Sequence, residues 1–107
     1  MNYEEGLKRY DSLLLNAGFN RKGKTMPYTS HNGHMFTLYN KAGEMGIRFS
    51  KEKQKEYFLK YDTSYFISYG AKMQGYILLT ENMFKDEQLI VRLILESYSY
   101  IETLEPK

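Results

Sequence analysis

The chain has 107 residues, of which 42% are apolar and 26% charged, with 15 Lys and Arg against 13 Asp and Glu. This length predicts a single domain, residues 1–107, with one hydrophobic core. The absence of cysteine excludes disulfides, thiolate metal sites and cysteine nucleophiles. No apolar run approaches the ~18 residues of a membrane span, and the N-terminus is too polar for a signal peptide, so we expect a cytoplasmic protein that contacts no membrane.

The first predicted element is an amphipathic helix over residues 3–16. Its apolar face repeats at three- and four-residue spacing and contains Tyr3, Leu7, Tyr10, Leu14 and Ala17. Glu4 and Glu5 lie in the first turn, where the helix dipole favours negative charge. Gly18 is the expected C-terminal cap.

Residues 25–50 change to a period of two and predict a three-stranded antiparallel meander. Its connectors contain Asn32-Gly33 and Ala42-Gly43, which are typical of tight turns. Pro27 cannot donate a ladder hydrogen bond, so the first strand is expected at a sheet edge. In the second strand, alternation places Phe36 and Leu38 on one face and Met35, Thr37 and Tyr39 on the other.

Beyond the meander, the pattern predicts a helix over about 51–61, for which Ser50 is a suitable N-cap. Strand patterns return at 65–69 and 76–80. The segment Gly70–Gly75 between these strands is too long for a tight turn. We therefore expect a loop there.

A turn of helix at 81–84 precedes a long last helix at about 87–104, which is apolar over more than half of its circumference. The fold class is therefore α+β, an antiparallel sheet with helices in the order α-β-β-β-α-β-β-α. A helix on one sheet needs an apolar stripe of only ~100°. The surplus requires a second cover, either the first helix or a second subunit. A homodimer would place at its seam Val91, Leu95 and Tyr98.

Short stretches along the chain match a known family in order and spacing. They are Asn32-Gly33-His34-Met35-Phe36 at a strand start, the strand Gly46-Ile47-Arg48-Phe49, and Met73 and Tyr76 followed by the helix-start pattern Glu81…Phe84…Asp86…Leu89. Across residues 24–104 this order resembles the N-terminal domain of the TfoX/Sxy family, named for regulators of bacterial competence. The resemblance supports the fold, and it implies no established reaction, substrate or catalytic residue.

The sequence departs from that family at two places. Family members usually carry a glycine-rich Met-Phe-Gly-Gly segment before the first hairpin, where this chain has residues 25–30, Thr-Met-Pro-Tyr-Thr-Ser. The regulators also carry a C-terminal domain similar to a helix-hairpin-helix. This chain is interpreted as one stand-alone domain, so the role of that second domain is not carried over.

The titratable residues predict no catalytic or metal-binding constellation. His31 and His34 are the only histidines, and neither Glu44 nor Asp62 supplies a third ligand at a fixed offset, so no metal and no cofactor are expected. The paired carboxylates lie at helix ends or on polar faces. No nucleophile elbow, P-loop or dinucleotide fingerprint occurs, so the chain is not expected to be an enzyme.

Positive charge is concentrated in the middle of the chain. Residues 21–60 hold nine basic and three acidic residues, a net of +6, whereas residues 61–107 have a net of −3. Such a segment, interleaved with aromatic residues, is typical of a phosphate or single-strand surface, although charge runs are more often solvated faces. The candidate contacts to nucleic acid are Arg21, Lys22, Lys24, Arg48, Lys51 and Lys55.

Together these patterns favour a non-catalytic regulatory or protein-interaction module that self-associates as a homodimer, with an unknown partner. The first alternative is a weak nucleic-acid-binding accessory domain that uses the basic segment 21–60. The second is a small-molecule pocket between the sheet and the last helix. Salt dependence of binding would separate the nucleic-acid hypothesis from the other two.

Overall fold

The computed structural model describes residues 1–107. The strands are β1 (Tyr28–His31), β2 (His34–Tyr39), β3 (Met45–Arg48), β4 (Tyr65–Ser68) and β5 (Ala71–Leu78). They form one antiparallel sheet in the order β1-β2-β3-β5-β4, which confirms the predicted α+β class and the edge position of β1. The helices are α1 (Tyr3–Asn16), α2 (Lys51–Lys60), α3 (Glu81–Phe84) and α4 (Glu87–Glu102). None of them combines the length and the apolar character needed to cross a bilayer.

The ends of the helices follow from local sequence. The Oγ of Ser50 accepts the Lys53 N–H at 3.2 Å, which caps α2 as predicted. Asp86 caps α4 in the same way, accepting the Leu89 N–H at 3.1 Å. Gly18, with φ of 94°, follows the last turn of α1 as expected. The predicted positions of these helices are therefore confirmed to within about two residues at each end.

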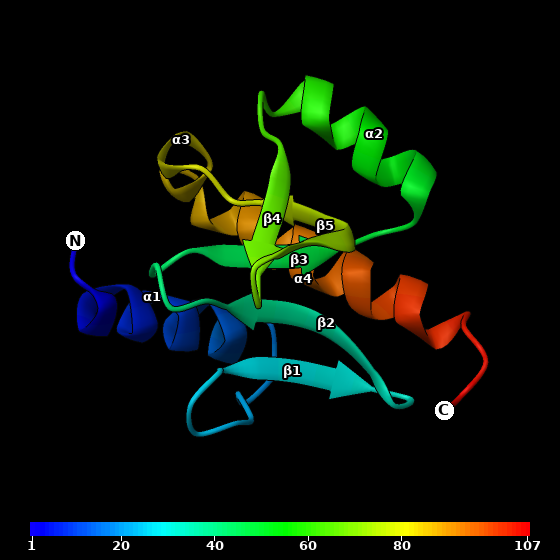
Figure 1. The fold of residues 1–107 in the computed structure, drawn as a ribbon, viewed down its shortest axis with the longest axis horizontal. Coiled ribbons are helices and arrows are strands. Elements are labelled where there is room, and N and C mark those ends of the chain that lie inside the picture. The colour runs from blue at the N-terminus through cyan, green and yellow to red at the C-terminus, as the bar shows by residue number, and fades with distance from the viewer.

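All four helices contribute side chains to one core on one face of the sheet. Figure 1 shows α4 behind β3 and β5. The most deeply buried residues of α4 in this core are Ile90, Ile94 and Ile101, each with no exposed surface. Burial of one such side chain stabilises the fold by about 1.5–3 kcal/mol, so α4 is a main source of stability.

The opposite face of the sheet is covered by the chain's own β4–β5 hairpin. In Figure 1, β4 crosses in front of β3. Beneath it lies a second, smaller core that contains Leu38, Phe66 and Tyr76. Asn40 fixes the crossing strand, because its Nδ2 donates to the Ile67 carbonyl at 2.8 Å. The sheet is thus buried on both faces without a second layer of helices.

The loop predicted at Gly70–Gly75 is wrong. The connection is a two-residue turn, Tyr69-Gly70, with φ of 54° and 72°, and β5 already begins at Ala71. Such turns are usually signalled by Asn-Gly or Asp-Gly, and tyrosine gives no such signal. Between the Ile67–Lys72 pair and the start of β4 the ladder is interrupted, and such an irregularity bends a strand.

The predicted alternation in β2 is also wrong. Thr29 pairs with Thr37, but the next residue of β1 pairs with Met35, which leaves Phe36 as an extra residue in β2. A bulge of this kind interrupts the alternation of side chains. Phe36 therefore packs in the helix-facing core, whereas Leu38 packs in the opposite one.

The β2–β3 turn supplies a first test. Gly43 has a φ of 80°, a conformation that strains β-branched residues. Gly43→Val is expected to lower the free energy of unfolding by about 1–2 kcal/mol, measured by urea denaturation. Ala42→Val, at the exposed neighbouring position, is the control and is expected to change it by less than about 0.5 kcal/mol. Equal losses in both variants would contradict the prediction.

Candidate functional site

Edge strand β4 and the turn after it present a row of exposed apolar side chains. Tyr65, Ile67 and Tyr69 alternate in sequence and are 44%, 52% and 66% exposed, whereas Phe66 and Ser68 between them are buried. These three residues, here named the β4 row, are three of the eight large hydrophobic residues that are exposed in the whole chain. Two-residue spacing places Tyr65 and Ile67 on the outer face of β4, and Tyr69 follows them in the turn.

A groove of about 700 Å³ lies beside the β4 row. Its walls are residues 67–70 of the hairpin on one side and residues 25–26 and 40–42 on the other. The Oγ of Ser68 is buried and has no hydrogen-bond partner. Lys41 contributes the one charged side chain. The groove therefore suits an apolar group.

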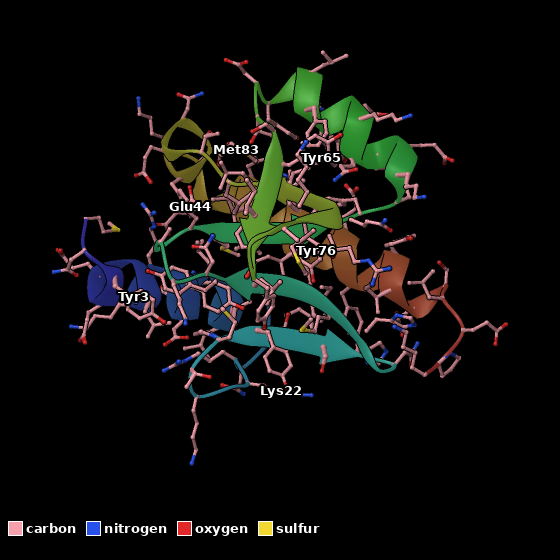
Figure 2. The ribbon with its side chains drawn as sticks, in the orientation of Figure 1. Tyr3, Lys22, Glu44, Tyr65, Tyr76 and Met83 are labelled. Carbon is pink, nitrogen blue, oxygen red and sulfur yellow. The ribbon has the colours of Figure 1, made fainter.

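Tyr65 connects the β4 row to α2. Its ring packs edge-on against Phe58 at 5.0 Å between centroids, and the Lys72 ammonium lies 4.5 Å from its centroid. Figure 2 places Tyr65 between β4 and α2. These contacts hold Tyr65 in position, whereas the structure gives the Tyr69 ring no aromatic or cationic neighbour.

Two adjoining cavities, here named the basic cleft, lie beyond Tyr65. The first, of about 150 Å³, lies between α2 and β5, and the second, of about 280 Å³, extends to the β1–β2 turn; Met73 and Gln74 line both. The cations that line the cleft are Arg48, Lys51, Lys55, Lys72 and Lys107. No Asp or Glu side chain lines it, and none of its cations forms an ion pair. The basic cleft therefore suits an anion.

The structure brings together three of the six predicted nucleic-acid contacts, namely Arg48, Lys51 and Lys55, in the basic cleft. Sequence reasoning missed Lys72 and Lys107, because both lie in the segment with net negative charge. The pairing of β5 with β3 and the return of the C-terminal residues to the β1–β2 turn place them in the cleft. No local sequence signal could have found this grouping.

The other three predicted contacts lie on the loop before β1 and outside the cleft. Arg21 is neutralised by Asp11, with Nε and Oδ1 3.0 Å apart. The Nζ of Lys22 donates to Ser30 at 3.1 Å, and Lys24 is exposed on the same loop. Figure 2 shows Lys22 below β1, at the opposite edge of the sheet from Tyr65. The predicted basic segment is thus divided between two separate surfaces.

The proposed dimer seam on α4 is largely covered within the chain. The ring of Tyr98 packs against Phe19 and His31, with centroids 5.1 and 4.6 Å apart. Val91 packs at the edge of the helix-facing core, and α1 covers part of the same helix. Leu95 alone is largely free, with 43% of its surface exposed. The surplus apolar arc of α4 therefore has a cover in the monomer.

The two histidines serve the packing of the β1–β2 turn. The Nε2 of His31 lies 3.6 Å from the Glu102 carboxylate. The Nε2 of His34 donates to the Glu105 carbonyl at 2.8 Å. No three His, Asp or Glu residues are placed to hold a metal ion, and the expectation that no metal binds stays a prediction. Comparison of the chain with protein-family models, curated proteins and solved structures gives no match.

Proposed function

We propose that this chain is a non-catalytic protein-interaction module that binds a partner protein through the β4 row. The observation that carries the proposal is the exposure of two alternating apolar side chains, Tyr65 and Ile67, on an edge strand and of Tyr69 in the turn that follows it. Soluble proteins usually protect such edges with charge, proline or a covering element, and contiguous apolar patches mark contact sites. Tyrosine is also enriched among the residues that anchor interfaces.

The surroundings of the row indicate the chemistry of the partner. The neighbouring groove accepts an apolar side chain. Lys41 and Lys72 lie next to the row and would attract carboxylates. We therefore expect a partner segment in which an apolar side chain is flanked by acidic residues.

The side chains of the β4 row suit a protein partner better than they suit single-stranded nucleic acid. Bases bind such surfaces by stacking on free aromatic faces. The Tyr65 ring already contacts Phe58 and Lys72, and Ile67 offers no ring, which leaves Tyr69 as the single free platform. A mixed aromatic and aliphatic row is instead suited to the apolar centre of a protein interface.

The resemblance to the TfoX/Sxy N-terminal domain supports a regulatory setting for this interaction, and we propose that residues 24–104 form a domain of that type. A homodimer through Val91, Leu95 and Tyr98 is the weaker proposal, because the structure covers two of these side chains within one chain. A dimer formed through the β4 row would instead make the partner a second copy.

Site-specific photo-crosslinking in the source cell tests the proposal. A photoreactive residue at position 69 is expected to capture one partner, and Ile67→Asp is expected to abolish that product. Position 59 is the matched control, because Leu59 is 87% exposed on α2 and lies outside the row. Mass spectrometry identifies the product, and a product of twice the chain mass assigns the row to self-association. Equal capture at positions 59 and 69, or capture that survives Ile67→Asp, would contradict the proposal.

A further inference from the structure

Two residues that line the 280 Å³ cavity of the basic cleft each have a buried polar atom without a hydrogen-bond partner. Tyr76 is 3% exposed and its hydroxyl has no hydrogen-bond partner. His34 is 8% exposed and its Nδ1 has none either. Buried polar atoms are nearly always paired, so two unpaired ones around one cavity indicate that something else completes them.

The protonation of both groups follows from their surroundings. The His34 Nε2 faces a carbonyl oxygen, which only accepts, so Nε2 carries a proton, and in the neutral tautomer Nδ1 is then an acceptor. Burial raises the pKa of the Tyr76 phenol, which therefore stays protonated at neutral pH, although the Arg48 charge opposes that shift. The cavity thus offers one unused donor and one unused acceptor. Figure 2 labels Tyr76 on the face of the sheet that β4 crosses.

Arg48 is also without a partner. Its side chain is half-buried in the cavity wall, and the structure gives its guanidinium neither an ion pair nor a hydrogen bond. Lys107 lies in the same wall, and no Asp or Glu side chain does. A partly desolvated guanidinium favours a carboxylate or phosphate, to which it donates two parallel hydrogen bonds.

We propose that this cavity binds a small ligand that carries an oxyanion, a phosphate or carboxylate group, next to a hydroxyl. The oxyanion accepts from Arg48 and Tyr76, and the hydroxyl donates to Nδ1 of His34. The volume lies just below the range of about 300–1,000 Å³ that is usual for small-molecule sites. A nucleic-acid backbone would pair with exposed cations, whereas the unpaired atoms of His34 and Tyr76 are closed to solvent and bind only a small ligand toward which these two cavity-lining side chains turn.

Titration with inorganic phosphate, followed by amide chemical shifts of the intact chain at constant ionic strength, tests this site. Phosphate is expected to shift the amides around Arg48 and His34. Sulfate, which has no proton to donate at neutral pH, is expected to bind several-fold more weakly. Equal affinity for the two anions would overturn the role given to His34. Absence of saturable shifts with phosphate would overturn the site itself.

Matched variants locate the binding. Tyr76→Phe is expected to weaken phosphate binding roughly tenfold without lowering the stability of the free chain, since the hydroxyl has no partner there. Arg48→Gln is expected to abolish binding, and Lys53→Gln, on α2 outside the cleft, to leave it unchanged. Equal affinity in all three variants would overturn the proposal. A single-stranded oligonucleotide that binds through Arg48 while phosphate does not would assign the cleft to nucleic acid and equally overturn it. Neither of these two outcomes tests the β4 row, so failure of this proposal is distinguishable from failure of the proposed protein interaction.

Discussion

Replacing Gly46 by valine is expected to lower the free energy of unfolding by about 2–4 kcal/mol. Gly46 lies in β3 under the ring of Phe66, and a Cβ there would come within 2.6 and 2.7 Å of the ring carbons Cδ2 and Cδ1. Valine gains up to about 1 kcal/mol in strand propensity over glycine. The steric overlap costs more free energy than this gain supplies. Phe66 cannot move away easily, because it has no exposed surface and its neighbour Ile67 is held by a hydrogen bond from Asn40.

Urea denaturation measures this loss, and two further variants establish its cause. Ala71→Val places valine at an exposed position of β5 and is expected to change stability by less than about 0.5 kcal/mol. In a Phe66→Ala background, Gly46→Val is expected to cost much less than in the parent chain, since the ring that it would strike is gone. Additive losses of Gly46→Val and Phe66→Ala would show that the hairpin does not pack on β3 as described.

The same packing explains what the sequence could predict of the fold. Helix α1, the caps of α2 and α4, and the turns at Asn32-Gly33 and Gly43 depend on nearby residues, so their signals are local. The crossing of the hairpin depends on the packing of Phe66 on Gly46, which lies twenty residues earlier in the chain. Alternation identifies Gly46 as one residue of a strand face, but it does not identify what packs on that face.

The exposure of the β4 row could not be predicted from the sequence, for a different reason. In β4 the outward residues Tyr65 and Ile67 are as apolar as a core face, while the inward face contains the polar Ser68. A rule that places the more apolar face inside therefore gives the wrong orientation for this strand. A contact surface requires exposed apolar side chains. The strand for which alternation predicts the wrong face is therefore also the strand that forms the proposed interface.

The basic cleft illustrates the limit of charge runs as a signal. Residues 21–60 contain nine basic residues, but those before β1 are paired or lie on another surface. The cleft instead combines Arg48 with Lys72 and Lys107 from the segment with net negative charge. The net charge of a segment does not predict which cations the fold brings together or how far it removes them from water. These two properties decide whether a guanidinium is available to a ligand.

Replacing Gly6 by alanine is expected to destabilise the chain, although alanine in a helix normally stabilises by about 1 kcal/mol relative to glycine. Gly6 is buried in α1 against Tyr39, and a Cβ there would overlap the tyrosine hydroxyl oxygen. That hydroxyl donates to the Tyr3 carbonyl at 2.6 Å, and the ring packs against Tyr10, so it cannot move freely. We expect a net loss of about 1–2 kcal/mol, the overlap outweighing the propensity.

The Tyr39→Phe background is expected to reverse the sign of this effect. Without the hydroxyl oxygen, the nearest atom to the new Cβ is the ring carbon Cζ at 3.3 Å, a tight contact that a small shift relieves. Gly6→Ala should then stabilise by up to about 1 kcal/mol, comparable to Ser12→Ala on the exposed side of α1, which is the control. Urea denaturation of the four chains of the double-mutant cycle gives the coupling between positions 6 and 39. A gain on Gly6→Ala in the parent chain would contradict the close approach of α1 to β2, because helix propensity would then be the only term at work.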